Sequence, residues 1–191
     1  MRIGIFGGSF NPPHKAHVLV ASLVLSSDLV DKILVVPCLA HPFSKDLEGF
    51  SHRMEMCRLA FGIFGDQVMV SDLEERLSGM SYTIDTLRAL TSERPGDEFR
   101  LITGSDIVLE FSRWREGSEV ERLAPPILLG RGDADVPVPD GWEKIWDHPL
   151  PDVSSSEIRK MILRDDDCRR LLPAHVFLYI KENELYGSKN R

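Results

Sequence analysis

Short segments rich in β-branched and apolar residues alternate with helical patterns along most of the chain, and this alternation constrains the fold more than any other feature. The segment Lys32–Pro37 (KILVVP) is apolar throughout its centre, which is typical of a strand in a parallel sheet that helices cover on both faces. Parallel neighbours need crossover connections, and these are right-handed. The pattern therefore predicts an α/β protein with a Rossmann-like, doubly wound, mostly parallel sheet and a small C-terminal helical part.

The expected elements follow from hydrophobic periodicity and from turn residues. The strands are expected at Arg2–Phe6, Lys32–Pro37, Gln67–Ser71, Phe99–Thr103 and Pro126–Gly130, with an edge strand at Lys144–Asp147. The helices are expected at Lys15–Ser26, Ser51–Phe64, Thr83–Glu93 and Pro173–Leu185, with another that begins at Ser154–Glu157 and short pieces at Ile107–Phe111 and Ser118–Leu123. The length predicts one domain over residues 1–191, with the helical subregion from about residue 153.

Charge, cysteine content and hydropathy exclude several classes of function. The net charge of −7 argues against nucleic-acid and membrane-surface partners, although a small phosphorylated ligand needs only a local basic pocket. Three widely spaced cysteines without a C-x-x-C motif indicate reduced thiols in a cytoplasmic protein. The N-terminus lacks the apolar core of a signal peptide, and the longest apolar stretch, Val18–Leu25, is too short to span a bilayer.

The segment Gly7–His17 (GGSFNPPHKAH) has the character of an anion-binding loop. Ligands of doubly wound sheets bind at the carboxyl ends of the strands, where glycines allow backbone amides to approach closely. His14 and His17 are three residues apart at a helix start, so they share one face and can meet one anion. The alternatives are two ordinary helix-start histidines, or part of a zinc site with His41 or His52, which the spacing does not favour.

A second anion-binding pattern stands near the C-terminus, in Val153–Arg159 (VSSSEIR). Ser154 is expected to cap a helix, while Ser155 and Ser156 add hydroxyl and amide donors and Arg159 follows about one turn later. The alternative is a well-capped surface helix with a solvated arginine.

Both patterns resemble motifs of one enzyme superfamily. The first resembles the H-x-G-H nucleotidyltransferase signature in its longer form G-G-T/S-F-D-P-x-H-x-x-H, with Asn11 in place of the usual aspartate and Ala16 in place of the usual glycine. The second resembles the I-S-S-T-x-I-R motif, whose serines and arginine hold a nucleotide triphosphate in that superfamily. Neither departure removes a histidine.

Further stretches resemble the bacterial nicotinate-nucleotide adenylyltransferases. Gly79–Leu87 (GMSYTIDTL) is similar to their S-Y-T-x-D-T-L stretch, and Ile102–Asp106 followed by Trp114 is similar to their G-A-D…W segment. The spacing of Leu172–Tyr186 matches their C-terminal helix pattern. The resemblance covers most of the chain and is weakest over Arg131–Asp152, which reads as a long connection.

The resemblance implies adenylyl transfer from ATP to nicotinate mononucleotide, giving nicotinic acid adenine dinucleotide and pyrophosphate, with Mg²⁺ carried by the ATP phosphates and no metal site on the protein. The implied catalytic residues are His14 and His17. The implied ATP-binding residues are Gly7, Gly8, Ser9, Phe10, His17, Gly104, Asp106, Ser155, Ser156 and Arg159. The implied nicotinate mononucleotide ligands are Ser9, Lys45, Tyr82, Thr83 and Trp114.

Other readings remain open at the level of sequence. The acceptor could be nicotinamide mononucleotide or pantetheine phosphate, and Asn11 and Ala16 also permit a non-catalytic nucleotide-binding module. Lys45 lies in HPFSK rather than in the usual P-P-H-K, and Arg53 could either reinforce the phosphate pocket or pair on a helix surface. Monomer and homo-oligomer are equally compatible with the sequence.

Overall fold

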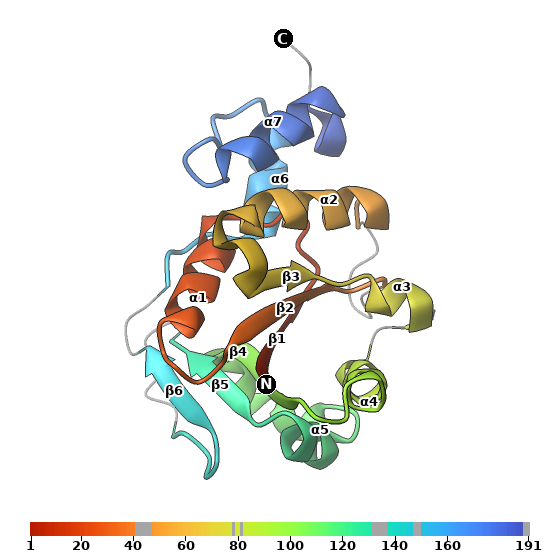
Figure 1. Cartoon of the computed structure of the whole chain (residues 1–191). Coiled ribbons are helices and arrows are strands. Elements are labelled where there is room, and N and C mark those ends of the chain that lie inside the picture. Colours follow the sequence, from red (N-terminus) through yellow and green to blue (C-terminus); the bar gives the residue numbers. More distant parts are fainter. Residues whose placement is uncertain (41–46, 78, 81, 131–136, 147–149, 189–191) are drawn as a thin grey trace.

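The computed structural model describes residues 1–40, 47–77, 79–80, 82–130, 137–146 and 150–188 of the 191-residue chain. Its centre is a six-stranded sheet in the order β3-β2-β1-β4-β5-β6 (Figure 1). Every neighbouring pair in this sheet is parallel. This order confirms the expected doubly wound sheet, and its direction of winding reverses between β1 and β4, where such sheets bind ligands.

The strands are β1 (Arg2–Gly8), β2 (Lys32–Pro37), β3 (Val68–Val70), β4 (Glu98–Gly104), β5 (Pro126–Leu129) and β6 (Glu143–Trp146). The helices are α1 (Lys15–Leu25), α2 (Phe50–Phe61), α3 (Leu73–Leu77), α4 (Thr83–Glu93), α5 (Gly117–Leu123), α6 (Ser155–Leu163) and α7 (Ala174–Glu182). Short 3₁₀ segments are η1 (Gly62–Gln67), η2 (Ser105–Leu109), η3 (Phe111–Arg113) and η4 (Leu185–Gly187). Within the described ranges, no helix has the length and apolar composition needed to cross a membrane.

Three helices differ from the expected ones. Helix α2 ends at Phe61 instead of Phe64, because a 3₁₀ segment follows in which Gly65 adopts a φ of 53°. Helix α7 begins after Pro173, which is its N-cap and not its first helical residue, and it ends before Glu184, whose φ of 52° is left-handed. Helix α3 was not expected, since its five residues are too few to show a helical period.

The sheet separates two hydrophobic layers, and successive residues of one strand face opposite layers. Ile33 and Val35 pack with α1, α2, α6 and α7, whereas Leu34 and Val36 pack with α3, α4 and α5. This double coverage explains why Lys32–Pro37 is apolar throughout its centre. The three cysteines are buried free thiols.

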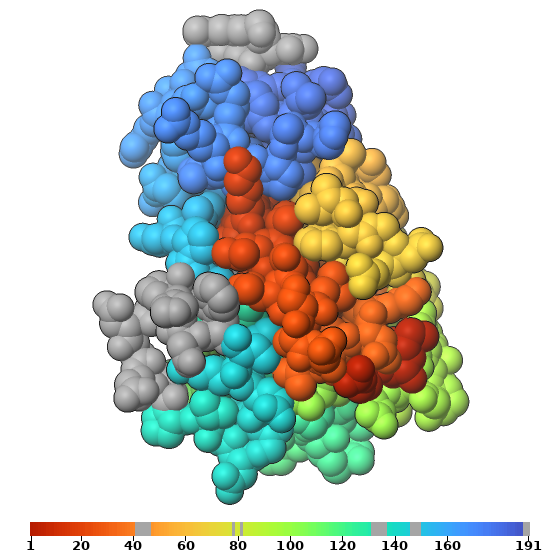
Figure 2. Space-filling model, turned by 60° about the vertical axis from the view of Figure 1, so that its left-hand side comes forward, coloured from red at the N-terminus to blue at the C-terminus, as the bar shows by residue number. Residues whose placement is uncertain are grey.

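The C-terminal helices share a core with the sheet. Ile158 and Val176 belong to the same buried cluster as Phe6 and Phe61. Figure 1 shows α6 and α7 stacked over α2 and α1, and Figure 2 shows the blue C-terminal residues resting directly on the red surface of α1. The single domain expected from the sequence predicts that these helices unfold together with the sheet.

Two aliphatic residues of α6, one buried and one exposed, test the shared core. Ile158 is fully buried, whereas Leu163 on the same helix is 70% exposed. Ile158→Ala is expected to lower the free energy of unfolding by about 2–5 kcal/mol, because it leaves a cavity in the common core. Leu163→Ala should change it by less than about 0.5 kcal/mol. Denaturant unfolding followed by circular dichroism measures both, and a separate transition for the C-terminal helices would contradict the single domain.

Candidate active site

A cavity of about 700 Å³ opens at the carboxyl ends of the central strands. Its walls include Gly7 and Gly8 from the end of β1, Val36 and Cys38 from β2 and the residue after it, and Thr103 from β4. The cavity therefore lies at the reversal of strand order, in agreement with the general rule for ligand sites in such sheets.

The glycines at the end of β1 present bare backbone to this cavity. A Cβ atom at Gly7 would meet nothing within 4 Å, and one at Gly8 would lie 3.3 Å from the Phe10 ring. The Phe10 side chain is itself buried, with its ring centroid 5.4 Å from that of Phe6 and 6.0 Å from that of Phe61. Phe10 could therefore contact a nucleotide only through its backbone.

His14 and His17 form one rigid pair at the start of α1. The backbone N–H of His14, the N-cap residue, donates to His17 Nδ1 at 3.1 Å, and the two ring centroids are 3.8 Å apart. Since Nδ1 of His17 accepts this bond, Nε2 is the nitrogen that carries the proton. The Phe10 ring, centred 5.0 Å from the His17 ring, packs against the pair. The structure thus holds the His17 ring in one tautomer and one orientation.

The start of α6 is bonded directly to the histidine loop. Ser155 Oγ donates to the carbonyl oxygen of Pro12 at 2.8 Å, across 143 residues of sequence. Arg159 Nη1 donates to the carbonyl oxygen of Asn11 at 2.8 Å, and its Nη2 donates to Ser156 Oγ at 3.3 Å. The two predicted anion-binding motifs therefore converge in space, with the second helix capped as expected.

Asn11 is a buried junction between three segments. Its side-chain Oδ1 accepts hydrogen bonds from the Tyr186 hydroxyl at 2.8 Å and from the Glu48 backbone N–H at 3.2 Å. Asn11 is only 1% exposed, so a neutral amide avoids the desolvation cost that a carboxylate would carry there. Burial also raises the pKa of Tyr186, which keeps its hydroxyl protonated as the donor.

Arg53 does not pair on the helix surface, because its side chain is buried within the strand-end loops. It is 1% exposed and lies on α2. Its Nη1 donates to the carbonyl oxygens of Ser9 at 3.0 Å and Cys38 at 2.7 Å, and its Nε donates to that of Glu48 at 2.8 Å. The guanidinium therefore fixes the loops that follow β1 and β2, and it supplies positive charge beneath them.

Three of the residues expected at the nicotinate end lie together in the cavity wall, whereas Ser9 is not part of that wall. Tyr82 and Thr83 at the start of α4, and Trp114 after η3, all line it. The Trp114 ring is centred 5.3 Å from the Phe111 ring at an interplanar angle of 34°, which fixes the indole. Lys45 lies outside the described residues.

Gly104 and Asp106 stand beside the cavity and not in its wall. They follow Thr103 at the carboxyl end of β4, where η2 begins, and Asp106 is exposed. Their neighbours Thr103 and Ile107 line the cavity.

Four charged residues of the wall were not expected from the sequence. They are Glu74, Glu110, Arg113 and Arg115. Glu74 is 9% exposed, accepts from Thr86 Oγ1 at 2.9 Å through Oε1, and accepts from the Leu39 N–H at 3.3 Å through Oε2. A lone glutamate in a short charged helix carries no signal of burial. For the arginines, the only feature of the sequence that could have indicated a place in the wall is that Arg115 directly follows Trp114.

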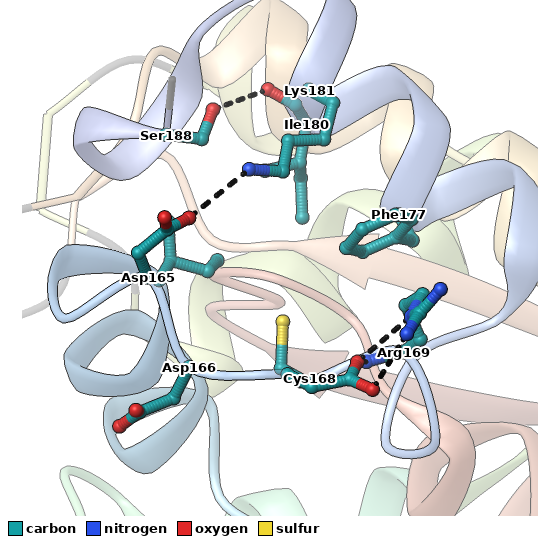
Figure 3. A pocket seen from close by; sticks show the side chains of 10 residues that line it. Asp165, Asp166, Cys168, Arg169, Phe177, Ile180, Lys181 and Ser188 are labelled. Atoms are coloured by element: carbon teal, nitrogen blue, oxygen red, sulfur yellow. Dashed lines mark hydrogen bonds and ion pairs between the residues drawn. The ribbon is translucent and has the colours of Figure 1, made fainter. Parts of the chain in front are cut away.

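A smaller cavity of about 180 Å³ lies in the C-terminal part (Figure 3). Four of its charged side chains form two ion pairs: Lys181 Nζ lies 3.9 Å from Asp165 Oδ1, and Arg169 Nη2 lies 2.8 Å from Asp167 Oδ2. Two of the three aspartates in the run 165–167 are therefore paired with basic side chains of the same C-terminal part.

The zinc alternative gains no support from the described part of the chain. There, no group of three or more His, Cys, Asp or Glu side chains is arranged to hold a metal ion. His52 Nδ1 lies 2.9 Å from the Tyr179 hydroxyl, in a contact between α2 and α7. His41 falls outside the described residues.

Comparison with known proteins agrees with this geometry. Residues 5–161 match the cytidylyltransferase-like family. The "Probable nicotinate-nucleotide adenylyltransferase" of Anaeromyxobacter sp. (strain K) is 38% identical over 187 residues, which cover 96% of each chain. The chain belongs to the nicotinate-nucleotide adenylyltransferases of the cytidylyltransferase-like family. The Myxococcus xanthus (strain DK1622) protein of the same name is 33% identical, over 99% of this chain and 96% of that one.

Solved structures of nicotinate-nucleotide adenylyltransferases share the fold. The Plasmodium falciparum nicotinic acid mononucleotide adenylyltransferase complexed with NaAD superimposes with a TM-score of 0.81 at 24% identity, over 100% of this chain and 99% of that one. A putative nicotinate-nucleotide adenylyltransferase from Vibrio parahaemolyticus gives a TM-score of 0.71 at 21% identity, over 98% and 96%. The Rossmann-like architecture is therefore that of known members of this family.

The Tyr186–Asn11 bond predicts a specific dependence of stability on pH. Tyr186→Phe removes only the hydroxyl, so it should lower the free energy of unfolding by about 0.5–1.5 kcal/mol at pH 8. The raised pKa of Tyr186 in the folded protein means that its contribution is complete below pH 10 and is lost as the pH rises further.

Denaturant titrations at pH 8 and at pH 11 measure this effect. The difference between the wild type and Tyr186→Phe should shrink at the higher pH. Tyr179→Phe is the control and should show a weaker trend, because the pKa of Tyr179 is raised less than that of Tyr186 and its hydroxyl contacts His52 instead of Asn11. A constant difference between wild type and Tyr186→Phe across this range would show that Tyr186 does not hold Asn11 as described.

Proposed function

We propose that this protein transfers the adenylyl group of ATP to nicotinate mononucleotide. The products are nicotinic acid adenine dinucleotide and pyrophosphate. The observation that carries the proposal is the pair of bonds from Arg159 and Ser155 to the histidine loop, because these bonds bring two anion-binding helix starts to one place. The names of the curated relatives support the same acceptor.

The reaction we propose is an in-line displacement at the α-phosphorus of ATP. A phosphate oxygen of nicotinate mononucleotide attacks this phosphorus, and the bond to the oxygen that bridges to the β-phosphorus breaks. The electron pair of that bond leaves with pyrophosphate. Because the attacking phosphate is already anionic, no protein nucleophile is required, and catalysis consists of positioning and charge stabilisation.

The geometry suggests how the residues divide this work. His17 Nε2–H, whose direction is fixed by the bond from His14, would donate to the α-phosphate region as charge develops. Ser155, Ser156 and Arg159 would hold the β- and γ-phosphates that leave. At the other end, Tyr82, Thr83 and Trp114 would hold the nicotinate ring, since an indole face suits a cationic pyridinium.

Mg²⁺ fits this site as an ion that enters with ATP. Bound through phosphate oxygens and water, it would neutralise charge on the triphosphate, and it needs no cage of protein carboxylates. The histidine loop and the start of α6 offer imidazole, hydroxyl and guanidinium groups, which suit phosphate oxygens better than a bare cation. The three free thiols fit a reducing compartment such as the cytoplasm.

The decisive assay is the release of pyrophosphate from ATP and Mg²⁺ by the purified full-length protein. Release is expected when nicotinate mononucleotide is added, together with one equivalent of the dinucleotide. Pantetheine phosphate in its place should give no release above background. Binding of ATP without any turnover would instead indicate a nucleotide-binding module.

His17→Ala tests the role of the imidazole. It removes a positioned donor to developing charge, so kcat should fall at least about 10²–10³-fold. His175→Ala is the matched control, since His175 is exposed on α7, and its kcat should equal that of the wild type. Thermal melting verifies that both variants fold. A His17→Ala rate close to wild type would remove this histidine from the chemistry.

A further inference from the structure

Arg115 stands at the nicotinate end of the cavity. It follows Trp114 directly and lines the same wall as Tyr82. Its guanidinium carbon lies 4.7 Å from the centroid of the Tyr82 ring, and its Nη1 donates to Asp85 Oδ2 at 3.3 Å. Across the described ranges, no other acceptor takes a side-chain hydrogen bond from Arg115. The guanidinium therefore retains donors for a ligand in the cavity.

The backbone that carries Arg115 is anchored to α4. The next residue, Glu116, accepts hydrogen bonds from both terminal nitrogens of Arg88, at 3.1 and 2.6 Å. Arg88 belongs to α4, the helix whose start supplies Tyr82 and Thr83 to the cavity. The segment that carries Arg115 is thus bonded to the helix that carries the expected ring-binding residues.

The two pyridine mononucleotides differ at a single substituent. Both carry a cationic pyridinium ring, which a nearby guanidinium repels, but only the nicotinate form adds a carboxylate. A guanidinium binds a carboxylate through two parallel charge-assisted hydrogen bonds, and it gains much less from a neutral carboxamide. Two acidic residues of the same wall, Glu74 and Glu110, would oppose a carboxylate that lacked a basic partner. The position of Arg115 therefore bears directly on which mononucleotide is accepted.

We infer that Arg115 is the residue that makes this cavity select nicotinate mononucleotide over nicotinamide mononucleotide, by binding the carboxylate on the ring. The inference rests on the proposed function, since it takes the ring to lie beside Tyr82 and Trp114. Asp85 positions the guanidinium of Arg115, and the long contact of 3.3 Å allows that guanidinium to turn toward the carboxylate of a bound ring.

The test compares kcat/KM for the two mononucleotides, with ATP and Mg²⁺, in the wild type and in Arg115→Gln. The wild type should prefer the nicotinate form. In Arg115→Gln, kcat/KM for that form should fall about tenfold, since the lost bond is charge-assisted but the side chain is half exposed. The value for nicotinamide mononucleotide should stay within about twofold. Arg115→Lys keeps the positive charge without the planar guanidinium, so its kcat/KM for the nicotinate form should lie between those of the wild type and Arg115→Gln.

Two arginines serve as matched controls. Arg76 is exposed to the same 52% as Arg115 and pairs with Glu93, but it lies outside the cavity wall, so Arg76→Gln should leave both rates unchanged. Arg113 lines the same cavity, and Arg113→Gln should change both rates by one common factor.

The outcomes separate the inference from the proposed function. Equal losses for both mononucleotides in Arg115→Gln, or no loss, overturn the inference while turnover by the wild type upholds the function. An equal loss of selectivity in Arg113→Gln also overturns it, because net charge rather than position would then decide. Failure of the wild type to use nicotinate mononucleotide overturns both. A loss of selectivity confined to Arg115→Gln establishes the assignment.

Discussion

The site depends on the attachment of the start of α6 to the loop after β1. The carbonyl oxygens of Asn11 and Pro12 accept hydrogen bonds from Arg159 and Ser155. Each of these carbonyls precedes a proline, so neither peptide unit offers an N–H to balance its oxygen. Without α6, this part of the loop would present only negative dipoles, which repel phosphate. The donors of α6 offset these dipoles, which the triphosphate binding that we propose for this loop requires.

Other polar groups of the loop are also hydrogen-bonded to distant segments of the chain. Arg53 donates a hydrogen bond to the carbonyl oxygen of Ser9, while the Tyr186 hydroxyl and the Glu48 N–H donate to the side-chain oxygen of Asn11. Buried polar groups are stable only when they are bonded in this way. As a result, segments from the beginning, the middle and the end of the chain hold one loop in one conformation. The His17 ring, whose Nδ1 is already bonded, gains its fixed direction from this frame.

The cavity beyond the loop combines a flat aromatic wall with opposed charges. Trp114 and Tyr82 offer ring faces, whereas Glu74 and Arg115 place charges of both signs around them. A zwitterionic pyridinium carboxylate matches such a wall better than a simple cation does. In the function that we propose, different elements would therefore carry the two tasks: α4 and the segment after η3 would recognise the ring, and α1 and α6 would bind the phosphates.

The sequence by itself determined the alternation of strands and helices, the glycines and histidines after β1, and the capped start of α6, because each of these is encoded by neighbouring residues. The element types were largely correct, while α3 and the ends of α2 and α7 depended on short or left-handed segments that periodicity does not register. Only the tertiary structure decided that Arg53 is buried, that Asn11 meets Tyr186, and that Arg115 lies over Tyr82. Those contacts join residues far apart in the chain, and their energies depend on burial and direction, which no local pattern of residues specifies.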